Sequence, residues 1–157
     1  MKLKLLAVGK IKREAYQNLA DEYERRIRHF HPLEVIEIPD EKVNDRAEIP
    51  KILDKEALRI EKQLKRDSYL IVLDEKGDQW SSVDLAWELG RLFQEPVSEI
   101  AFLIGGAFGI ADSLKQKAKV RFSLSKLTLP HQLARVLTLE QLYRALTILK
   151  NVPYHHE

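Results

Sequence analysis

The sequence contains no cysteine, and this absence restricts its chemistry. Without cysteine the chain forms no disulfide, offers no thiolate nucleophile and builds none of the Cys-based sites that hold zinc or iron–sulfur clusters. The histidine pairs His29/His31 and His155/His156 lack the i, i+4 spacing of a helical zinc motif. We therefore expect no metal site, and a chemistry carried by nitrogen and oxygen groups.

Long apolar runs are also missing. No stretch approaches the ~20 consecutive apolar residues of a membrane-spanning helix, and the run near Met1 is too short for a signal peptide. We therefore expect a soluble, cytoplasmic protein. With only 6 Gly and 6 Pro against 45% hydrophobic residues, the chain has too few breakers to be disordered. Its 157 residues predict a single domain over residues 1–157.

Charge is distributed unevenly along the chain. Residues 98–157 hold 8 Lys and Arg against 4 Asp and Glu, whereas residues 1–97 hold 18 against 20. A modestly basic C-terminal part is consistent with contact to a polyanion, and equally with an ordinary solvated surface.

Short runs rich in Leu, Ile and Val predict strands separated by amphipathic segments with helical spacing. Two of these runs, around Ile71 and Phe102, are apolar without alternation, which is typical of strands covered on both faces of a parallel sheet. The expected strands are Leu3–Val8, Leu33–Ile38, Tyr69–Leu73, Ile100–Ile104 and Val120–Leu124. The expected helices carry Tyr16 to Phe30, Ile49 to Leu64, Ser81 to Leu92 with a Ser81/Asp84 capping box, and the stretch from Pro130 to about Lys150.

Strand and helix therefore alternate along the chain, which predicts an α/β fold with a mostly parallel sheet and helices on both faces. In such a sheet the ligand site lies beyond the carboxyl ends of the strands. Those ends are expected at Gly9, Leu73-Asp74, Gly105-Gly106 and from Ser125 onward.

A glycine-rich turn follows the strand that ends at Ile104. Gly105, Gly106 and Gly109 would let the backbone approach a ligand closely, although a tight structural turn explains them equally well. The spacing matches neither the dinucleotide fingerprint G-x-G-x-x-G nor a P-loop.

A second loop, residues 123–131, is rich in small and hydroxyl side chains. Its backbone N–H and C=O groups suit the edge of a purine. The alternative is a plain strand-to-helix connection, with Ser125 or Thr128 as a cap and Pro130 in the first turn. A Ser–His nucleophile with His131 is disfavoured, because no G-x-S-x-G elbow surrounds either serine.

The chain end concentrates aromatic and imidazole groups. Tyr154, His155 and His156 suit stacking on nucleic-acid bases and hydrogen bonding to them, although a docked terminus would also explain them. Glu140 and Arg144 stand four residues apart and can pair on one helix face, usually as a solvated bridge.

Taken in order, these segments resemble one family: the RlmH ribosomal large-subunit pseudouridine methyltransferases of the SPOUT superfamily of α/β-knot enzymes. The resemblance covers essentially the full length. It rests on Ala7-Val8-Gly9-Lys10, Ile36-Glu37-Ile38-Pro39, Ile52-Leu53-Asp54-Lys55-Glu56, Leu73-Asp74, Ile104-Gly105-Gly106, Ser123-Leu124-Ser125, Leu127-Thr128-Leu129-Pro130-His131, Leu142-Tyr143-Arg144-Ala145 and Pro153-Tyr154-His155.

The resemblance implies a fold and an activity that residue patterns alone do not. The fold would be a SPOUT domain whose C-terminal part forms a deep trefoil knot, and the enzyme would be a homodimer. The activity would be transfer of a methyl group from S-adenosylmethionine (SAM) to N3 of a pseudouridine in large-subunit (23S) ribosomal RNA, on assembled ribosomes.

The resemblance also assigns residues. The cofactor pocket is expected at Leu73, Gly105, Leu124, Ser125, Lys126, Leu127, Thr128 and Leu129. The catalytic candidates are His155 as a base or its hydrogen-bond partner, Arg144 as a cation beside the uracil oxygens, and Tyr154 as a stacking group. RNA contacts are expected at Lys10, Lys12, Arg13, His131 and Arg135, and a partner subunit is expected to complete the RNA site.

Two other classes compete with this interpretation. A non-catalytic ribosome- or RNA-binding module would keep the pocket without the reaction, and it would differ from an enzyme by releasing no heat on titration with SAM. A flavodoxin-like nucleotide or flavin protein is disfavoured because the sequence has no phosphate-cradling loop.

Overall fold

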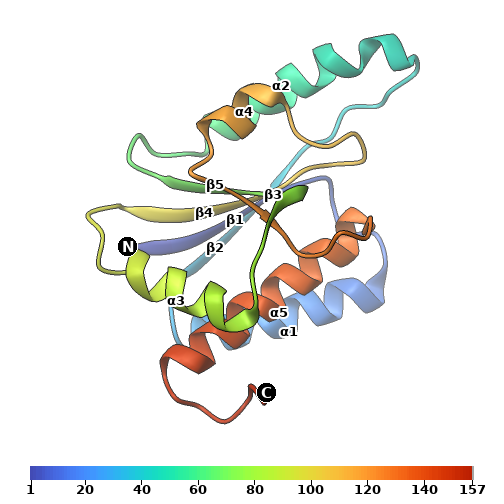
Figure 1. Ribbon diagram of the computed structural model, residues 1–157. Helices are drawn as coiled ribbons and strands as arrows, with labels where there is room; N and C mark the ends of the chain where they lie inside the picture. Colours follow the sequence, from blue (N-terminus) through green and yellow to red (C-terminus); the bar gives the residue numbers. More distant parts are fainter. Residues whose placement is uncertain (157) are drawn as a thin grey trace.

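The computed structural model describes residues 1–156 and contains a five-stranded sheet in the order β2-β1-β4-β3-β5 (Figure 1). Every neighbouring pair of strands is parallel, as the apolar runs predicted. The strands are β1 Lys2–Val8, β2 Leu33–Ile38, β3 Tyr69–Gln79, β4 Glu99–Ile104 and β5 Val120–Ser123. All carboxyl ends therefore point to one edge of the sheet, where the ligand site was expected.

Helices cover both faces of the sheet. The first group, α1 Glu14–Arg28, α3 Ser82–Leu92 and α5 His131–Leu149, lies on one face, and α5 packs against both α1 and α3 (Figure 1). The second group, α2 Ile49–Glu61 and the short α4 Asp112–Lys117, lies on the other face (Figure 1). A 3-10 turn, Arg46–Glu48, leads into α2.

Strand β1 shows how the sequence divides the core into two layers. Successive side chains of a strand point to opposite faces, so Leu3 and Leu5 join the cluster under α1, α3 and α5. Leu6 and Val8 join the separate cluster under α2 and α4. A strand buried on both faces must be apolar at nearly every position, which is why the runs around Ile71 in β3 and Phe102 in β4 show no alternation of hydrophobicity.

Two elements differ from the prediction. β3 continues to Gln79, because after a register shift beyond Leu73 the polar residues Asp78 and Gln79 pair with β5. α4 was not predicted, since it is only six residues long and buries one side chain fully, Leu114. A helix this short has too few turns to produce a periodic apolar signal.

The capping box predicted for α3 is confirmed. The Ser81 side chain accepts a hydrogen bond from the Asp84 backbone N–H, and the Asp84 carboxylate accepts one from the Ser81 backbone N–H at 2.8 Å. No helix within residues 1–156 is long and apolar enough to cross a membrane. The trefoil knot implied by the family resemblance stays a prediction.

Candidate active site

Three loops meet around a cavity of about 490 Å³ at the carboxyl ends of β3, β4 and β5. Its volume lies within the range of roughly 300–1,000 Å³ usual for sites that hold small molecules and cofactors. The lining residues come from 73–76 within β3 at its register shift, from 104–110 at the end of β4 and beyond it, from 124–125 and 127–129 after β5, and from Lys115, His131 and Ala134.

The glycine turn forms one wall of this cleft, and its backbone is tightly closed. Gly109 N–H donates to the Gly106 carbonyl at 3.1 Å, and Gly109 adopts φ +85°. A Cβ added at Gly105 would stand 2.5 Å from the carbonyl oxygen of Gly109, so only glycine fits there. Phe108, at the tip of the turn, is 47% exposed at the rim of the cleft.

The loop after β5 forms the facing wall. Leu124, Ser125, Leu127, Thr128 and Leu129 line the cleft, whereas Lys126 does not. The Ser125 hydroxyl accepts a hydrogen bond from the Leu127 N–H at 3.0 Å and thereby shapes the loop itself.

The alternative that a serine or threonine of this loop caps α5 is wrong. The cap position of α5 is Pro130, which makes no side-chain cap hydrogen bond. The first N–H groups of α5 therefore lie beside the cleft without a side-chain cap among the described residues, a position that favours polar ligand groups.

Asp74 is the main electrostatic feature that residue patterns did not single out. Its carboxylate, 8% exposed, accepts from Arg121 Nη2 at 2.7 Å and lies 3.7 Å from Lys115 Nζ. Burial acts to raise the pKa of Asp74, but hydrogen bonds from the Lys76 backbone N–H and Arg121, with the two cationic charges, outweigh it and hold the pKa below its ordinary value. Asp74 is therefore a fixed negative charge at this edge.

The predicted RNA contacts divide into two groups. His131 lines the cleft, and the exposed residues Lys10 and Lys12 lie next to the start of α5, where Lys12 N–H donates to Gln132 Oε1 at 2.9 Å. Arg13, also exposed, precedes α1 at the same edge.

Arg135 does not fit the role predicted for it. It is only 5% exposed, and its Nη1 donates to Glu37 Oε1 at 2.8 Å. An RNA phosphate would have to displace Glu37 to reach this guanidinium, so its position gives the predicted RNA contact no support.

The three catalytic candidates do come together, at the far end of α5. Arg144 donates to Glu140 Oε1 from Nε at 3.0 Å and from Nη2 at 2.5 Å, and Tyr154 donates to the same oxygen at 3.1 Å. Arg144 Nη1 lies 3.3 Å from His155 Nδ1, and its guanidinium lies 4.7 Å from the Tyr154 ring centroid. We call these four residues the tail cluster.

The tail cluster is more enclosed than the solvated bridge expected for Glu140 and Arg144, since their side chains are 14% and 24% exposed. The hydrogen bonds to Glu140 raise the pKa of Arg144, which stays a cation. Burial raises the pKa of the Tyr154 hydroxyl, so it stays a hydrogen-bond donor at neutral pH. His155 Nε2 is buried without a hydrogen-bond partner among the described residues.

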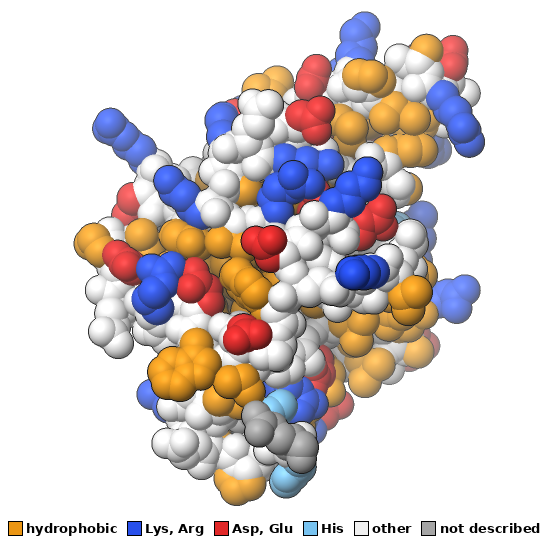
Figure 2. Space-filling view, in the orientation of Figure 1, with side chains coloured by type: hydrophobic (Ala, Val, Ile, Leu, Met, Phe, Trp, Pro, Cys, Tyr) orange, Lys and Arg blue, Asp and Glu red, His pale blue; other side chains and the backbone are white. Residues whose placement is uncertain are grey.

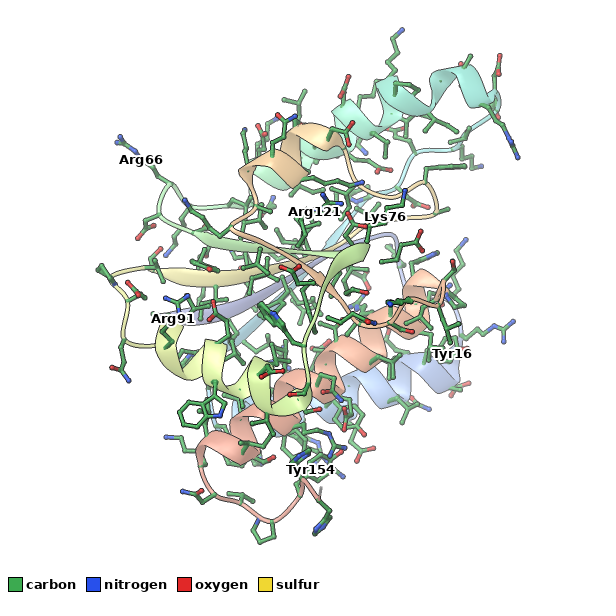
Figure 3. All side chains as sticks on the ribbon, in the orientation of Figure 1. Tyr16, Arg66, Lys76, Arg91, Arg121 and Tyr154 are labelled. Carbon is green, nitrogen blue, oxygen red and sulfur yellow. The ribbon has the colours of Figure 1, made fainter. Side chains whose placement is uncertain are left out.

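One chain keeps its tail cluster away from its own cleft. His131 begins α5 beside the cleft, and Arg144 follows almost four turns later. At 1.5 Å of rise per residue, this sequence separation amounts to about 20 Å along the helix. Figure 3 accordingly shows Tyr154 well away from Lys76, a residue that lines the cleft. Among residues 1–156, no group of three or more His, Asp or Glu side chains could hold a metal ion.

Solved structures share this fold. A protein from Bordetella pertussis Tohama I, described as a probable methyltransferase, superimposes with a TM-score of 0.54 at 13% identity, covering 92% of this chain and 93% of that chain. A second, from Legionella pneumophila, contains the bound cofactor SAM and superimposes with a TM-score of 0.51 at 13% identity, covering 92% of this chain and 66% of that one.

Sequence comparison is more specific. The protein named ribosomal RNA large subunit methyltransferase H of Geobacter metallireducens is 45% identical over 99% of both chains. Its namesake in Gloeobacter violaceus is 44% identical over 99% of both chains. The family model described as "Predicted SPOUT methyltransferase" matches residues 1–155. The chain therefore belongs to the SPOUT methyltransferase family.

Proposed function

We propose that this protein is a SAM-dependent methyltransferase of large-subunit ribosomal RNA, the activity named for its close relatives. One observation carries the proposal. Seven of the eight residues that the family resemblance assigned to the cofactor, all except Lys126, line the same cleft although they come from three loops distant in sequence.

The cleft fits the chemistry of the cofactor. Leu124, Leu127 and Leu129 supply apolar walls for an adenosyl group, and the closed turn at Gly105 exposes backbone to a ligand at close range. When bound, SAM supplies a methyl carbon made electrophilic by the attached sulfonium. The residues of the cleft hold the cofactor and exclude water. Because the methyl carbon is then held in line with the acceptor nitrogen, alignment of the two contributes to the rate of methyl transfer.

The proposed acceptor is N3 of a pseudouridine in 23S rRNA on assembled ribosomes. The imide proton of this ring is acidic only well above neutrality, so a base or a nearby cation is needed to promote its loss. His155 is the proposed base or its hydrogen-bond partner, Arg144 stabilises developing negative charge on the uracil oxygens, and Tyr154 stacks on or orients the ring. Glu140 holds Arg144 and Tyr154 in position through one carboxylate oxygen.

These roles require a second copy of the chain. Because Arg144 lies about 15 Å along α5 beyond Ala134, the last residue of the helix that lines the cleft, the tail of one protomer serves the cleft of its partner in this proposal. We therefore propose a homodimer in which each 157-residue chain acts as a single domain and each site combines a cleft from one chain with a tail from the other.

The activity is tested by mass spectrometry of ribosomal RNA from cells that lack this protein. The expected result is the loss of one methyl group from one pseudouridine of the large-subunit rRNA, restored by the wild-type gene. Unchanged rRNA would contradict the proposal. Isothermal titration of the purified protein with SAM tests cofactor binding: heat at micromolar SAM supports the enzyme, and its absence supports a module that binds RNA without using the cofactor.

The shared site is tested by mixing two inactive variants, Gly105→Ala in the cleft and His155→Ala in the tail, after partial denaturation and refolding. Half of the dimers formed are mixed, and each mixed dimer has one intact site of two, so about one quarter of the wild-type rate is expected. Each variant refolded alone is the control. No recovery in the mixture, from variants that circular dichroism shows to be folded, would place cleft and tail in one chain.

A further inference from the structure

A second group of cations lies at the cleft, away from Lys10, Lys12 and Arg13. Lys76 follows the first part of β3, Lys115 lies in α4 and Arg121 lies in β5, and both lysines line the cleft. The Lys76 backbone and the Arg121 side chain both bind Asp74, and the two labelled side chains lie in the same region of Figure 3, where Figure 2 shows basic side chains gathered on the surface. We call these three residues the rim cluster.

The rim cluster is held in place by the chain itself. Arg121 donates to a single Asp74 oxygen from Nε at 3.1 Å and from Nη2 at 2.7 Å, and Lys115 Nζ lies 3.7 Å from the same oxygen. The Lys76 backbone N–H donates to the other oxygen at 3.0 Å. Asp74 therefore ties together β3, α4 and β5, orients the Arg121 and Lys115 side chains and holds the backbone of Lys76, whose side chain extends exposed beside them.

Asp74 does not neutralise the cluster. It supplies one negative charge against three positive ones, and the side chain of Arg121 remains 44% exposed. This end of β3 carries two more carboxylates. Glu75 accepts from the Thr128 hydroxyl at 3.2 Å, at the opposite wall of the cleft, and the exposed Asp78 pairs through its backbone with Phe122, next to Arg121, without an ion pair among the described residues. Arg121 donates to Asp74 from Nε and Nη2, and its Nη1 makes no hydrogen bond within residues 1–156, so one edge of the guanidinium stays free to donate.

A fixed guanidinium with a free edge, flanked by two ammonium groups, matches the oxygens of a phosphate group. Nucleic-acid backbones present such groups at regular spacing, and contacts to them set the position and orientation of the strand. The rim cluster comes from β3, α4 and β5. The other group of cations, Lys10, Lys12 and Arg13, follows β1, on the other side of the cleft.

We propose that Lys76, Lys115 and Arg121 bind backbone phosphates of the RNA that carries the methyl acceptor. The inference rests on the proposed function, and it assigns an RNA-binding surface to the α4–β5 side of the cleft. Asp74 acts in it as a positioning residue, which orients the cations without touching the RNA.

The test measures binding of purified large ribosomal subunits by the full-length protein at several salt concentrations. Each cation that binds a phosphate adds about 1 to the slope of log K against log salt, so its removal makes the slope shallower by that amount. Lys76→Gln should therefore lower the slope by about 1, and Lys76→Gln/Arg121→Gln by about 2. The matched control is Arg66→Gln, an exposed cation far from the cleft in Figure 3, which should leave the slope unchanged.

Two further readouts distinguish phosphate binding from misfolding and from a role in holding the cofactor. Thermal unfolding checks that the double variant is folded, and Lys76→Gln, whose exposed side chain makes no ion pair in the described residues, tests the cluster without disturbing Asp74. In methylation assays the KM for ribosomal subunits should rise while kcat is retained. Titration with SAM should give the wild-type affinity.

The outcomes separate this inference from the proposed function. If wild-type protein methylates the rRNA but the folded variants keep its full salt slope, the rim cluster does not bind phosphate and the inference is wrong. If the variants lose SAM affinity instead, the cations serve the cofactor carboxylate, which also overturns it. A wild-type protein that leaves rRNA unmethylated overturns the proposed function itself.

Discussion

At the residue scale, the cleft is built more from backbone than from reactive side chains. The turn at Gly105 and the loop 124–129 present main-chain groups, and the apolar walls come from leucines. Small-residue loops at strand ends therefore indicated where the cleft lies, and the family resemblance assigned the proposed cofactor residues there, whereas Asp74 was noted only as a strand end and as part of a family motif. Its role depends on Lys115 and Arg121, which no local pattern connects to it.

Gly105→Ala tests the backbone claim directly. The added Cβ would stand 2.5 Å from Gly109 O and 2.6 Å from Ile110 Cγ1, so the turn must shift away from the cleft. We expect SAM binding to become undetectable by calorimetry. Gly109→Ala serves as a comparison. Its Cβ would meet no atom within 4 Å, but the φ of +85° strains the backbone of the turn without a steric clash. Normal SAM affinity in a folded Gly105→Ala protein would refute the claim that the backbone at Gly105 lies close to the cofactor.

Asp74→Asn tests the negative charge at the rim. Because the folded pKa of Asp74 is depressed, its ionisation stabilises the protein above the ordinary pKa of 3.8, and this stabilisation is lost as the pH falls below that value. We expect the variant to be less stable at pH 7 on the order of 1–3 kcal/mol, the cost of removing hydrogen bonds to a charged group.

The difference between Asp74→Asn and wild type should shrink as the pH falls through 3.8, when measured by urea unfolding at each pH. A difference that stays constant between pH 7 and pH 3 would show that the carboxylate charge contributes nothing.

At the element scale, the core strands and the helices α1, α2 and α3 follow from local pattern because each buries apolar side chains, whereas the buried side of α5 also includes the polar residues Arg135, Thr138 and Thr147. The two elements that differ from the prediction do so for the same physical reason. The end of β3 pairs through polar residues after a register shift, and α4 is too short to show periodicity, so tertiary contacts decide both. Because α4 was missed, Lys115 was missed as a residue of the cleft.

Ser81→Ala tests the capping box that begins α3. The serine hydroxyl satisfies the Asp84 N–H at 3.1 Å, and losing such a cap costs about 0.5–2 kcal/mol. We expect lower stability in urea unfolding and unchanged SAM affinity, since α3 does not line the cleft. Ser82→Ala is the adjacent control, because its hydroxyl bonds Gln141 and not the helix end. Equal stability of Ser81→Ala and wild type would contradict the capping role.

At the scale of the whole molecule, the two halves of the candidate site lie at opposite ends of α5. The family resemblance indicated which residues belong to the tail and which to the cleft, but the hydrophobic periodicity of the sequence does not predict the distance between them. That distance follows from the length of α5, and it is the reason for proposing a homodimer.

The decisive measurement is methyl transfer in a purified system. The protein is incubated with SAM labelled on its methyl group and with ribosomes from cells that lack the protein, and the rRNA nucleosides are then separated and identified. We expect label in N3-methylpseudouridine of the large-subunit rRNA and none with Gly105→Ala. Label on no rRNA nucleoside, or equal labelling by Gly105→Ala, would contradict the proposed function and the cleft assigned to it.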